Sequence, residues 1–526
     1  MFCRLISATV IGVVSEIIEV EVDLKKGLPH QSIVGLPDPA VREAKERVNS
    51  AIRNSGYNFP LGRLTINLAP ADIKKEGSIF DLAIAVGILT VSKQIKIIEN
   101  LDASIIVGEL SLDGFIRPIR GLLAILERAK NIGVKNIILP LGNYQEALLI
   151  SDLNIYPVQY LQDAVKIISG CKHDTKEIFV GKKNKENMNE QSGDYDIDFS
   201  EVKGQNYAIR AVEVAVSGGH NLLLIGSPGS GKTMIATRIP TIIPPLSENE
   251  SIETSKIYSV SGFLPAHEGL IRNRPFRAPH HTASEISIIG GGKNPIPGEI
   301  TLAHNGILFL DEFTEFKSSI IQSLRQPIES GVITIARADS RITFPALFML
   351  VVSMNPCPCG YLFDPERVCQ CTFSQISKYY MKISGPVLDR IDIQIEVKPL
   401  KANDIVEYSS TEPSANIRER VMKARKIQAE RFTKHGITLN AMMTTGLIKK
   451  FCVLDNRMQQ LLYDAINKYK LSVRSSYKVL KVARTIADLD ERNHITTDDI
   501  LEALSYREVE NILYNKPFNK KHIVYS

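Results

Sequence analysis

The most restrictive segment of the sequence is residues 221–233, NLLLIGSPGSGKT, in which a short apolar run is followed directly by a glycine-rich loop. The apolar run predicts a buried parallel strand, and the residues after it fit the pattern G-x-x-x-x-G-K-[ST] at every fixed position. Glycine lets backbone N–H groups turn toward a phosphate because no Cβ stands in the way. A helix predicted over 234–239 directs its positive end at the same anion. The segment therefore predicts an ATP-binding site.

The glycine-rich loop comprises Gly226, Ser227, Pro228, Gly229, Ser230, Gly231, Lys232 and Thr233. In such a loop the lysine places its charge on the β- and γ-phosphates, and the threonine hydroxyl binds Mg²⁺. A second motif, GILFLDE at 306–312, is an apolar run that ends in Asp311 and Glu312. Asp311 is predicted to hold Mg²⁺ and Glu312 to polarise the attacking water. Together the two motifs predict ATP hydrolysis with Mg²⁺ as cofactor.

The segment in front of the loop, DFSEVKGQNYAIRAVEVAVSGGHNLLLIG, resembles the corresponding segment of AAA+ ATPases. The next strand predicted after the acidic motif, at 347–353, is followed closely by Asn355. This position suits the residue that aligns the attacking water with the γ-phosphate. The alternative is that Asn355 only makes a turn before a proline.

Related ATPases present an arginine to the nucleotide of a neighbouring subunit from a position between a helix and a strand, and SGPVLDRIDIQIEV places Arg390 there. A guanidinium in trans stabilises the charge on the transferring phosphoryl group. A surface ion pair with Asp389 or Asp392 is the alternative. In the C-terminal segment, Arg474 matches the lid arginine that reaches back to the γ-phosphate, and Arg484 is the second candidate. An arginine that acts in trans implies an oligomer.

Two β-branched runs around a short polar turn predict a hairpin over 332–344. Its place between the acidic motif and Asn355 resembles that of the hairpin that projects into the central pore of ring-shaped helicases. Arg337 and Arg341 flank its tip, where they would contact DNA phosphates without reading the base sequence. A solvated hairpin without a partner is the alternative.

Cys357, Cys359, Cys369 and Cys371 form two C-x-C pairs around a loop. Four thiolates in two close pairs match the tetrahedral ligand set that Zn²⁺ prefers, although the commoner spacing is C-x₂-C. Four protein ligands leave no open position for water, so a zinc site here would be structural. Free thiols and a regulatory disulfide are the alternatives.

Residues 1–170 alternate β-rich runs with helical patterns and predict a separate α+β domain. Two segments in it, PADIKKEGSIFDLAIAVGIL and GELSLDGFIRPIRGLLAILERAKNIGVKNIILP, resemble the proteolytic domain of Lon-type proteases. The Ser-Lys dyad of that family would fall at Ile79 and Leu123, and neither side chain can act as a nucleophile or a base. Ser78 is one position away from the expected serine, where its side chain would point in another direction, and the lysine of the dyad would still be missing. We therefore predict a Lon-like fold without protease chemistry, in a domain for assembly or DNA contact.

At 526 residues the chain is too long for one core, and it is predicted to be a multidomain α/β protein. A polar, charged linker is predicted over 171–200, an ATPase core with a parallel sheet over 201–400, and a helical lid over 401–526. His280 and His281 lie in a Gly- and Pro-rich insertion. Adjacent side chains diverge on a helix or a strand and make no chelating pair, so we interpret both as surface or insertion-loop residues rather than metal ligands. The sequence has no apolar run of membrane-spanning length and no signal peptide pattern, so a cytoplasmic location is expected.

Segments along nearly the whole chain resemble the Mg-chelatase-like ATPases of the ComM/YifB family, namely GLPDPAVREAKERVNSAIRNSG, GSPGSGKTMIATRIP, PFRAPHHTAS, GILFLDE, NPCPCGY, SGPVLDRIDI and LKVARTIADL. The resemblance implies a ring-forming, hexameric, ATP-driven motor that acts on single-stranded or branched DNA. In that family the motor promotes branch migration when incoming DNA is integrated during natural transformation.

Two other functions stay open. One is an ATPase that remodels a protein partner in the manner of magnesium chelatase subunits; the Lon-like N-terminus and the four cysteines disfavour it. The other is an ATP-dependent protease, which Ile79 and Leu123 disfavour.

Overall fold

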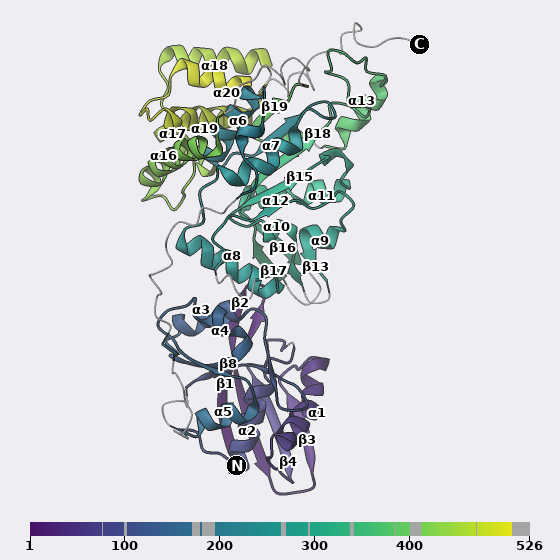
Figure 1. Ribbon diagram of the computed structural model, residues 1–526, viewed down its shortest axis with the longest axis vertical. Coiled ribbons are helices and arrows are strands. Elements are labelled where there is room, and N and C mark those ends of the chain that lie inside the picture. The colour runs from purple at the N-terminus through teal and green to yellow at the C-terminus, as the bar shows by residue number, and fades with distance from the viewer. Residues whose placement is uncertain are drawn as a thin grey trace. The chain divides into compact units, whose positions relative to one another are not determined.

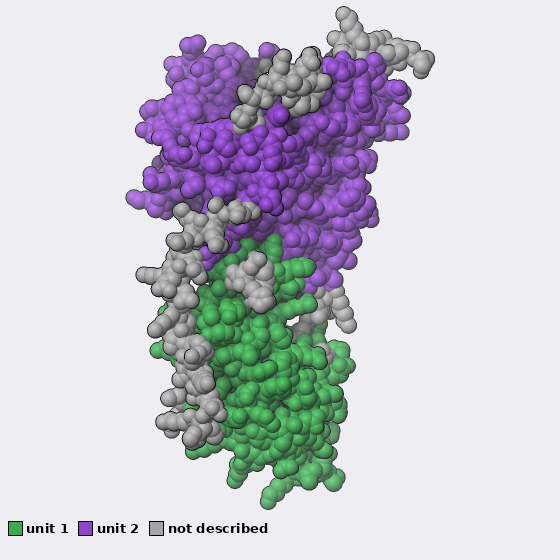
Figure 2. Space-filling model, in the orientation of Figure 1, with its two compact units in different colours: residues 1–190, 248–271 green, residues 191–247, 272–526 purple. Residues whose placement is uncertain are grey.

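The computed structural model describes residues 1–75, 77–98, 103–170, 179–180, 195–264, 270–292, 295–336, 341–383, 385–399, 412–469 and 471–507. Contacts between residues divide the chain into two compact units, which Figure 2 shows in different colours. Unit 1 contains residues 1–190 and 248–271, and unit 2 contains residues 191–247 and 272–526. Residues 248–271 thus cluster with the N-terminal unit, although they lie inside the span predicted for the ATPase core. The predicted linker lies mostly outside the described residues.

Unit 1 is built on a mixed sheet with the strand order β10-β9-β8-β5-β1-β2-β4-β3. A tight turn at Gly12 joins the two longest strands, because Ile11 pairs with Val14 and Gly12 takes a φ of 63° that other residues rarely adopt. The strands are β1 (Phe2–Ile11), β2 (Val14–Lys25), β3 (His30–Val34), β4 (Arg63–Ala69), β5 (Ile105–Ile106), β8 (Asn136–Pro140), β9 (Asn154–Val158) and β10 (Phe179–Val180). A separate short pair is formed by β6 (Glu109–Leu110) and β7 (Ile116–Arg117).

Successive side chains of a strand point to opposite faces, and unit 1 accordingly has an apolar core on each face of its sheet. In β8, Ile138 belongs to the core that includes α1, α2 and α5, whereas Ile137 belongs to the core that includes α3. The α2 segment is apolar on all sides because it is buried along nearly its whole length. The helices are α1 (Pro39–Asn54), α2 (Asp81–Val91), α3 (Leu122–Asn131), α4 (Tyr144–Ala147) and α5 (Leu161–Ile168).

The two positions that correspond to the Lon-type dyad are occupied by apolar side chains that pack in the core. The Leu123 side chain is fully buried, and Ile79 packs against the same apolar core. The neighbouring Ser78 hydroxyl donates a hydrogen bond to Glu109. Side chains that stabilise a core in this way supply neither a nucleophile nor a base.

Residues 248–271 begin with α8 (Glu248–Ser261), which packs on α3 within unit 1. Nζ of Lys256 lies 2.7 Å from Oε2 of Glu127 on α3, and the Ser259 hydroxyl donates to Glu146 on α4. Burial raises the pKa of the Glu146 carboxyl group. A segment remote in sequence is thus joined to unit 1 by polar as well as apolar contacts.

Unit 2 contains a parallel sheet with the strand order β12-β15-β18-β11-β19. Figure 1 labels its strands β15, β18 and β19. The central strands are buried on both faces, which explains why their sequences are continuous apolar runs. The strands are β11 (Leu222–Ile225), β12 (Phe276–Arg277), β15 (Ile307–Leu310), β18 (Met349–Met354) and β19 (Ile393–Glu396). Two antiparallel hairpins accompany the sheet, β13 (Gly290–Gly291) with β14 (Ile296–Pro297) and β16 (Val332–Ala336) with β17 (Arg341–Pro345).

The C-terminal part of unit 2 is helical, and one apolar core runs from the sheet into these helices. The predictions of a parallel sheet and a helical C-terminus are confirmed. The helices around the sheet are α6 (Asn206–Gly218), α7 (Lys232–Arg238), α9 (Glu285–Ile289), α10 (Glu299–Leu302), α11 (Ser318–Ser323), α12 (Arg325–Ser330), α13 (Phe373–Met381) and α14 (Gly385–Leu388). The C-terminal helices are α16 (Ser414–Phe432), α17 (Thr445–Phe451), α18 (Asn456–Tyr469), α19 (Val473–Leu489) and α20 (Thr497–Ser505). None of the described helices combines the length and the apolar composition needed to cross a membrane.

A buried polar cluster joins the C-terminal helices to the sheet. Nζ of Lys478 on α19 lies 2.8 Å from Oδ1 of Asp392, and Oδ2 of Asp392 accepts a 3.0 Å hydrogen bond from the backbone N–H of Asn221. Burial alone raises the pKa of Asp392, but Lys478 and His220 outweigh it and hold the pKa at about 2. Burial lowers the pKa of His220 to about 4, against the attraction of Asp392. His220 is therefore buried in its neutral form.

The buried His220 predicts a loss of stability in mild acid. Its pKa of about 4 in the folded chain lies below the ordinary value of 6.5, so the unfolded chain binds more protons between these two pH values. The contribution of the neutral His220 to the free energy of unfolding is fully present above about pH 6.5. The free energy of unfolding falls by about 2–3 kcal/mol as the pH drops toward 4.5. Urea unfolding followed by circular dichroism at a series of pH values measures this loss.

The loss is expected to be much smaller in His220→Gln, and the exposed His494→Gln is the matched control. Equal pH dependence in the wild type and in His220→Gln would contradict the assignment.

Candidate functional site

The glycine-rich loop connects the carboxyl end of β11 to the first residue of α7. A Cβ on Gly226 would lie 2.3 Å from the carbonyl oxygen of Val397, which is closer than atoms can approach. Gly229 and Gly231 adopt φ angles of 78° and 93°, in the left-handed region that glycine favours. The loop glycines are therefore required for its shape, and α7 begins at Lys232 with its backbone N–H groups directed into the loop.

Lys232 is held inside the loop. Its Nζ donates to the carbonyl oxygens of Gly226 at 2.7 Å and Ser227 at 3.0 Å, and it lies 3.4 Å from Oδ1 of Asn355. Burial lowers the pKa of Lys232, while Asp311 and Glu312 raise it. The structure thus brings Asn355, the residue that follows β18, next to the lysine of the loop.

Asp311 accepts hydrogen bonds from two hydroxyl groups. Oγ1 of Thr233 donates to Oδ2 of Asp311 at 2.7 Å, and the Ser353 hydroxyl donates to Oδ1. A threonine hydroxyl and a carboxylate side by side are the Mg²⁺ ligands of phosphate-loop ATPases. Ser353 was not predicted from the sequence, because only the pairing of β15 with β18 brings it to Asp311.

The residues of the loop fit a nucleotide with Mg²⁺. Oγ of Ser230 is buried and has no hydrogen-bond partner among the described residues, as expected for a group that faces a ligand. Lys232, Thr233 and Asp311 would hold the phosphates and the metal ion, and Glu312 lies next to Asp311 at the end of β15. Bound Mg²⁺ would neutralise charge on the phosphates.

A cavity of 400 Å³ opens beside Asp311 and Glu312. Its other wall includes His280 and His281, which follow β12. Nδ1 of His281 lies 3.3 Å from Oε2 of Glu312. The interpretation of these histidines as surface residues missed this contact, because only the pairing of β12 with β15 brings residue 281 near residue 312.

Arg390 and Arg474 meet at one carboxylate. Nη2 of Arg390 lies 2.7 Å from Oε1 of Glu329, and Arg474 pairs with the same oxygen. Burial opposes ionisation, but hydrogen bonds from Arg474 and Arg390 lower the pKa of Glu329. Arg484, the second candidate for the lid arginine, is buried within α19 and pairs with Asp488 instead.

The four cysteines lie together as a metal site requires. Their sulfur atoms are all within 4.8 Å of one another, and the closest pair, Cys357 and Cys359, is 3.3 Å apart. Four sulfurs bound tetrahedrally to Zn²⁺ at 2.3 Å would be about 3.8 Å apart. A disulfide needs about 2.05 Å, and all four cysteines are free thiols here. The donor set therefore fits zinc.

The cysteine loop contacts the phosphate loop. A Cβ on Gly360 would lie 2.6 Å from Cδ of Pro228, so the two loops touch through a residue without a side chain. The loop begins just after Asn355, and the Tyr380 hydroxyl donates to the carbonyl oxygen of Pro356 at 2.6 Å. The cysteine cluster and the phosphate loop are therefore neighbours in the fold.

The predicted hairpin is confirmed as the antiparallel pair β16–β17. Arg341 is exposed at the first position of β17. Arg337 lies outside the described residues, as does the rest of the tip.

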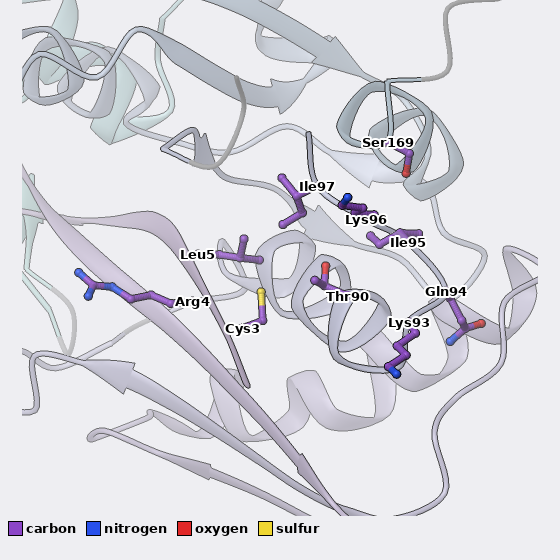
Figure 3. Close-up of a pocket in the computed structure, with 10 residues that line it drawn as sticks. All are labelled: Cys3, Arg4, Leu5, Thr90, Lys93, Gln94, Ile95, Lys96, Ile97 and Ser169. Atoms are coloured by element: carbon purple, nitrogen blue, oxygen red, sulfur yellow. The ribbon is translucent and has the colours of Figure 1, made fainter. Parts of the chain in front are cut away.

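A larger cavity of 760 Å³ lies in unit 1, between β1, the end of α2 and the end of α5 (Figure 3). Its charged side chains are Arg4, Lys93 and Lys96, and Arg4 pairs with Glu19. No carboxylate or histidine lines this cavity among the described residues, and its remaining titratable side chain is the thiol of Cys3.

Three family models match the chain in succession. "Subunit ChlI of Mg-chelatase" matches residues 20–143, "Magnesium chelatase, subunit ChlI" matches residues 198–405, and the C-terminal model of the same subunit matches residues 411–507. The fold and these matches define a Mg-chelatase-like protein of the AAA+ class, which implies an ATPase that uses ATP and Mg²⁺.

Similar proteins extend over nearly the whole chain. Competence protein ComM of Haemophilus influenzae is 41% identical over 505 residues, which cover 95% of this chain and 96% of that protein. YifB of Escherichia coli is 41% identical over 505 residues, with 96% of each chain covered. The chain therefore belongs to the ComM/YifB family. Lon protease 1 of Hydrogenovibrio crunogenus is 26% identical over 164 residues, which cover 29% of this chain and 20% of that protein.

Proposed function

We propose that this chain is a ring-forming, ATP-driven motor that moves single-stranded or branched DNA, and that it acts in recombination during natural transformation. The observation that carries the proposal is the ATPase site in a chain that aligns along 95% of its length with a competence protein. Lys232 and Thr233 would hold ATP and Mg²⁺ together with Asp311, and Glu312 would activate water.

Cleavage at a subunit interface would require the Arg390 side chain, which is 12% exposed, to leave its ion pair with Glu329. The side chain of Arg474 joins the same carboxylate. Glu329 and Arg474 are each more than 40% exposed, so their pair contributes only about 0–1 kcal/mol and exchanges readily for a phosphate. We propose that Arg390 reaches the nucleotide of a neighbouring subunit in a hexamer, with Arg474 as the lid arginine that senses the γ-phosphate.

The β16–β17 hairpin is proposed to contact DNA. Arg341 is exposed, and Arg337 is predicted to flank the other side of the hairpin tip. Arginines on a hairpin bind phosphates without base specificity, as a motor that tracks along DNA requires.

The four cysteines are proposed to hold one structural Zn²⁺. All four ligands would come from the protein, so the metal would fix the loop and would take no part in the hydrolysis. Through Gly360 and Asn355 the fixed loop would support Pro228 and Lys232 of the phosphate loop.

A second candidate function is the remodelling of a protein partner by a metal-chelatase-type ATPase. The matching family models, which describe a magnesium chelatase subunit, favour it. The two functions predict different activators, DNA for the first and a protein for the second.

DNA is expected to stimulate ATP hydrolysis. The wild type should hydrolyse ATP about tenfold faster with a forked oligonucleotide, because a motor couples turnover to its track. Arg341→Ala should raise the DNA concentration needed for half-maximal stimulation, and Arg457→Ala, an exposed substitution on α18, is the matched control. Glu312→Gln controls for contaminating ATPases. A rate of ATP hydrolysis that is unchanged by DNA but increased by a chelatase-type protein would favour the second candidate function.

Zinc removal is expected to weaken nucleotide binding. The purified chain should contain about one zinc per chain by mass spectrometry. Cys369→Ser should lose the metal and bind ATP about tenfold more weakly, because the loop that contacts Pro228 is no longer fixed. Cys3→Ser, outside the cluster, should keep both properties. A metal-free wild type, or wild-type ATP affinity in Cys369→Ser, would contradict the proposed zinc role.

A further inference from the structure

The two edges of the parallel sheet in unit 2 carry different parts of the proposed ATPase site. The phosphate loop follows β11 at the carboxyl edge, whereas Arg390 lies before β19 at the amino edge. These strands pair in parallel over four residues, Leu222–Ile225 with Ile393–Glu396, which span a length of about 13 Å. That length exceeds the reach of an arginine side chain. The phosphate loop is therefore out of reach of Arg390 of the same chain.

An exposed apolar surface lies beside the phosphate loop at the carboxyl edge. The side chain of Met381, the last residue of α13, is 77% exposed, and Val368 and Phe373 are exposed as well. On the inner side of α13, Ile376 is buried against the cysteine cluster. The cysteine loop in turn touches Pro228 of the phosphate loop. The cysteine cluster therefore holds these three exposed side chains, the cysteine-loop surface, beside the nucleotide site.

A second exposed apolar surface surrounds the two arginines at the amino edge. Val473, next to Arg474 at the start of α19, is 72% exposed. Leu347 is exposed shortly before β18, and only β11 separates β18 from β19, so Leu347 and Arg390 lie at the same edge. Glu329 pairs with both arginines and so brings them together. Leu347, Arg390, Val473 and Arg474 thus form one surface, the arginine surface.

The two surfaces are unlike each other, as a head-to-tail contact between copies of the chain requires. A contact that joins unlike surfaces closes into a ring when the rotation between copies closes. Exposed apolar side chains next to charged groups are typical of subunit interfaces. The phosphates of ATP beside the cysteine-loop surface and the guanidinium groups of the arginine surface are complementary in charge.

We infer that the cysteine-loop surface of one copy packs against the arginine surface of the next copy and that this contact completes the nucleotide site. Val368, Phe373 and Met381 supply the apolar part of the contact on one side, and Leu347 and Val473 supply it on the other. The cysteine cluster thereby acts on ring assembly as well as on the phosphate loop. The inference rests on the proposed function, because it assigns the interface of the proposed ring.

The experiment measures assembly of the full chain by sedimentation over a range of protein concentrations, with Mg²⁺ and a non-hydrolysable ATP analogue. Met381→Asp and Val473→Asp should each need about tenfold more protein for assembly, because each places a charge in the apolar contact. Both side chains are exposed in the single chain, and an acidic side chain is favourable in the first turn of α19. Adjacent residues of a helix do not face each other, so Val473→Asp leaves Arg474 free to act.

A matched control separates the proposed contact from a general effect of added charge. Met422 is an exposed residue of α16, which lies on the opposite side of unit 2 from α13 in Figure 1. Met422→Asp should assemble as the wild type. Zinc content and the affinity for a fluorescent ATP analogue should equal the wild-type values in all three variants at concentrations at which they are monomeric. Equal values show that each variant is folded and keeps its cysteine cluster.

Mixing the two defective variants tests the head-to-tail arrangement. The Val473→Asp chain keeps an intact cysteine-loop surface, and the Met381→Asp chain keeps an intact arginine surface. An equimolar mixture should therefore form pairs that contain one complete nucleotide site. Such a mixture should hydrolyse ATP at least about tenfold faster than either variant alone, because an arginine supplied in trans is worth at least that factor.

The outcomes are distinguishable. Wild-type assembly in Met381→Asp or in Val473→Asp overturns the inference alone, and so does an equal defect in Met422→Asp. A mixture that hydrolyses ATP no faster than its two components overturns the head-to-tail contact. A wild type that stays monomeric with nucleotide at every concentration contradicts the proposed function and, with it, the inference.

Discussion

The hydrogen bond between Thr233 and Asp311 is the interaction on which the rest of the site depends. It joins the first turn of α7 to the end of β15, and Ser353 of β18 donates to the same carboxylate. The parallel order β15-β18-β11 places the carboxyl ends of three strands at one edge, where ligands bind in sheets of this kind. Lys232 and Asn355 lie in contact at the same edge. Residues that follow three different strands would therefore contact the phosphate, the metal ion and the water.

Segments that bind no phosphate themselves contact this edge. The cysteine loop touches Pro228, and His281 contacts Glu312. Glu329 lies at the base of the β16–β17 hairpin and holds both Arg390 and Arg474. The Arg474–Glu329 pair is exposed and therefore weak, whereas the Arg390 side chain is only 12% exposed. Weak contacts around a rigid, buried sheet provide the movable parts that an ATPase motor requires.

Local patterns explain how much could be predicted from the sequence. The buried strand before Gly226 and the β16–β17 hairpin follow from apolar runs and β-branched residues, which act over a few residues. The family was also identified correctly, because its motifs are spread along nearly the whole chain.

Contacts between distant segments could not be predicted. Residues 281 and 312 meet only through the order of the strands, and Ser353 reaches Asp311 for the same reason. The clustering of residues 248–271 with unit 1 depends on packing against α3, which no local pattern encodes. The sequence therefore predicts which groups are present, whereas the tertiary structure decides which of them act together.

The central claim is that ATP is cleaved between subunits, with Arg390 supplied by a neighbour. The most direct test is the turnover number per chain, measured over a range of protein concentrations alongside sedimentation. Turnover should rise steeply as monomers assemble and should be nearly absent below the assembly concentration. A turnover number that stays constant down to concentrations at which only monomers sediment would contradict the account.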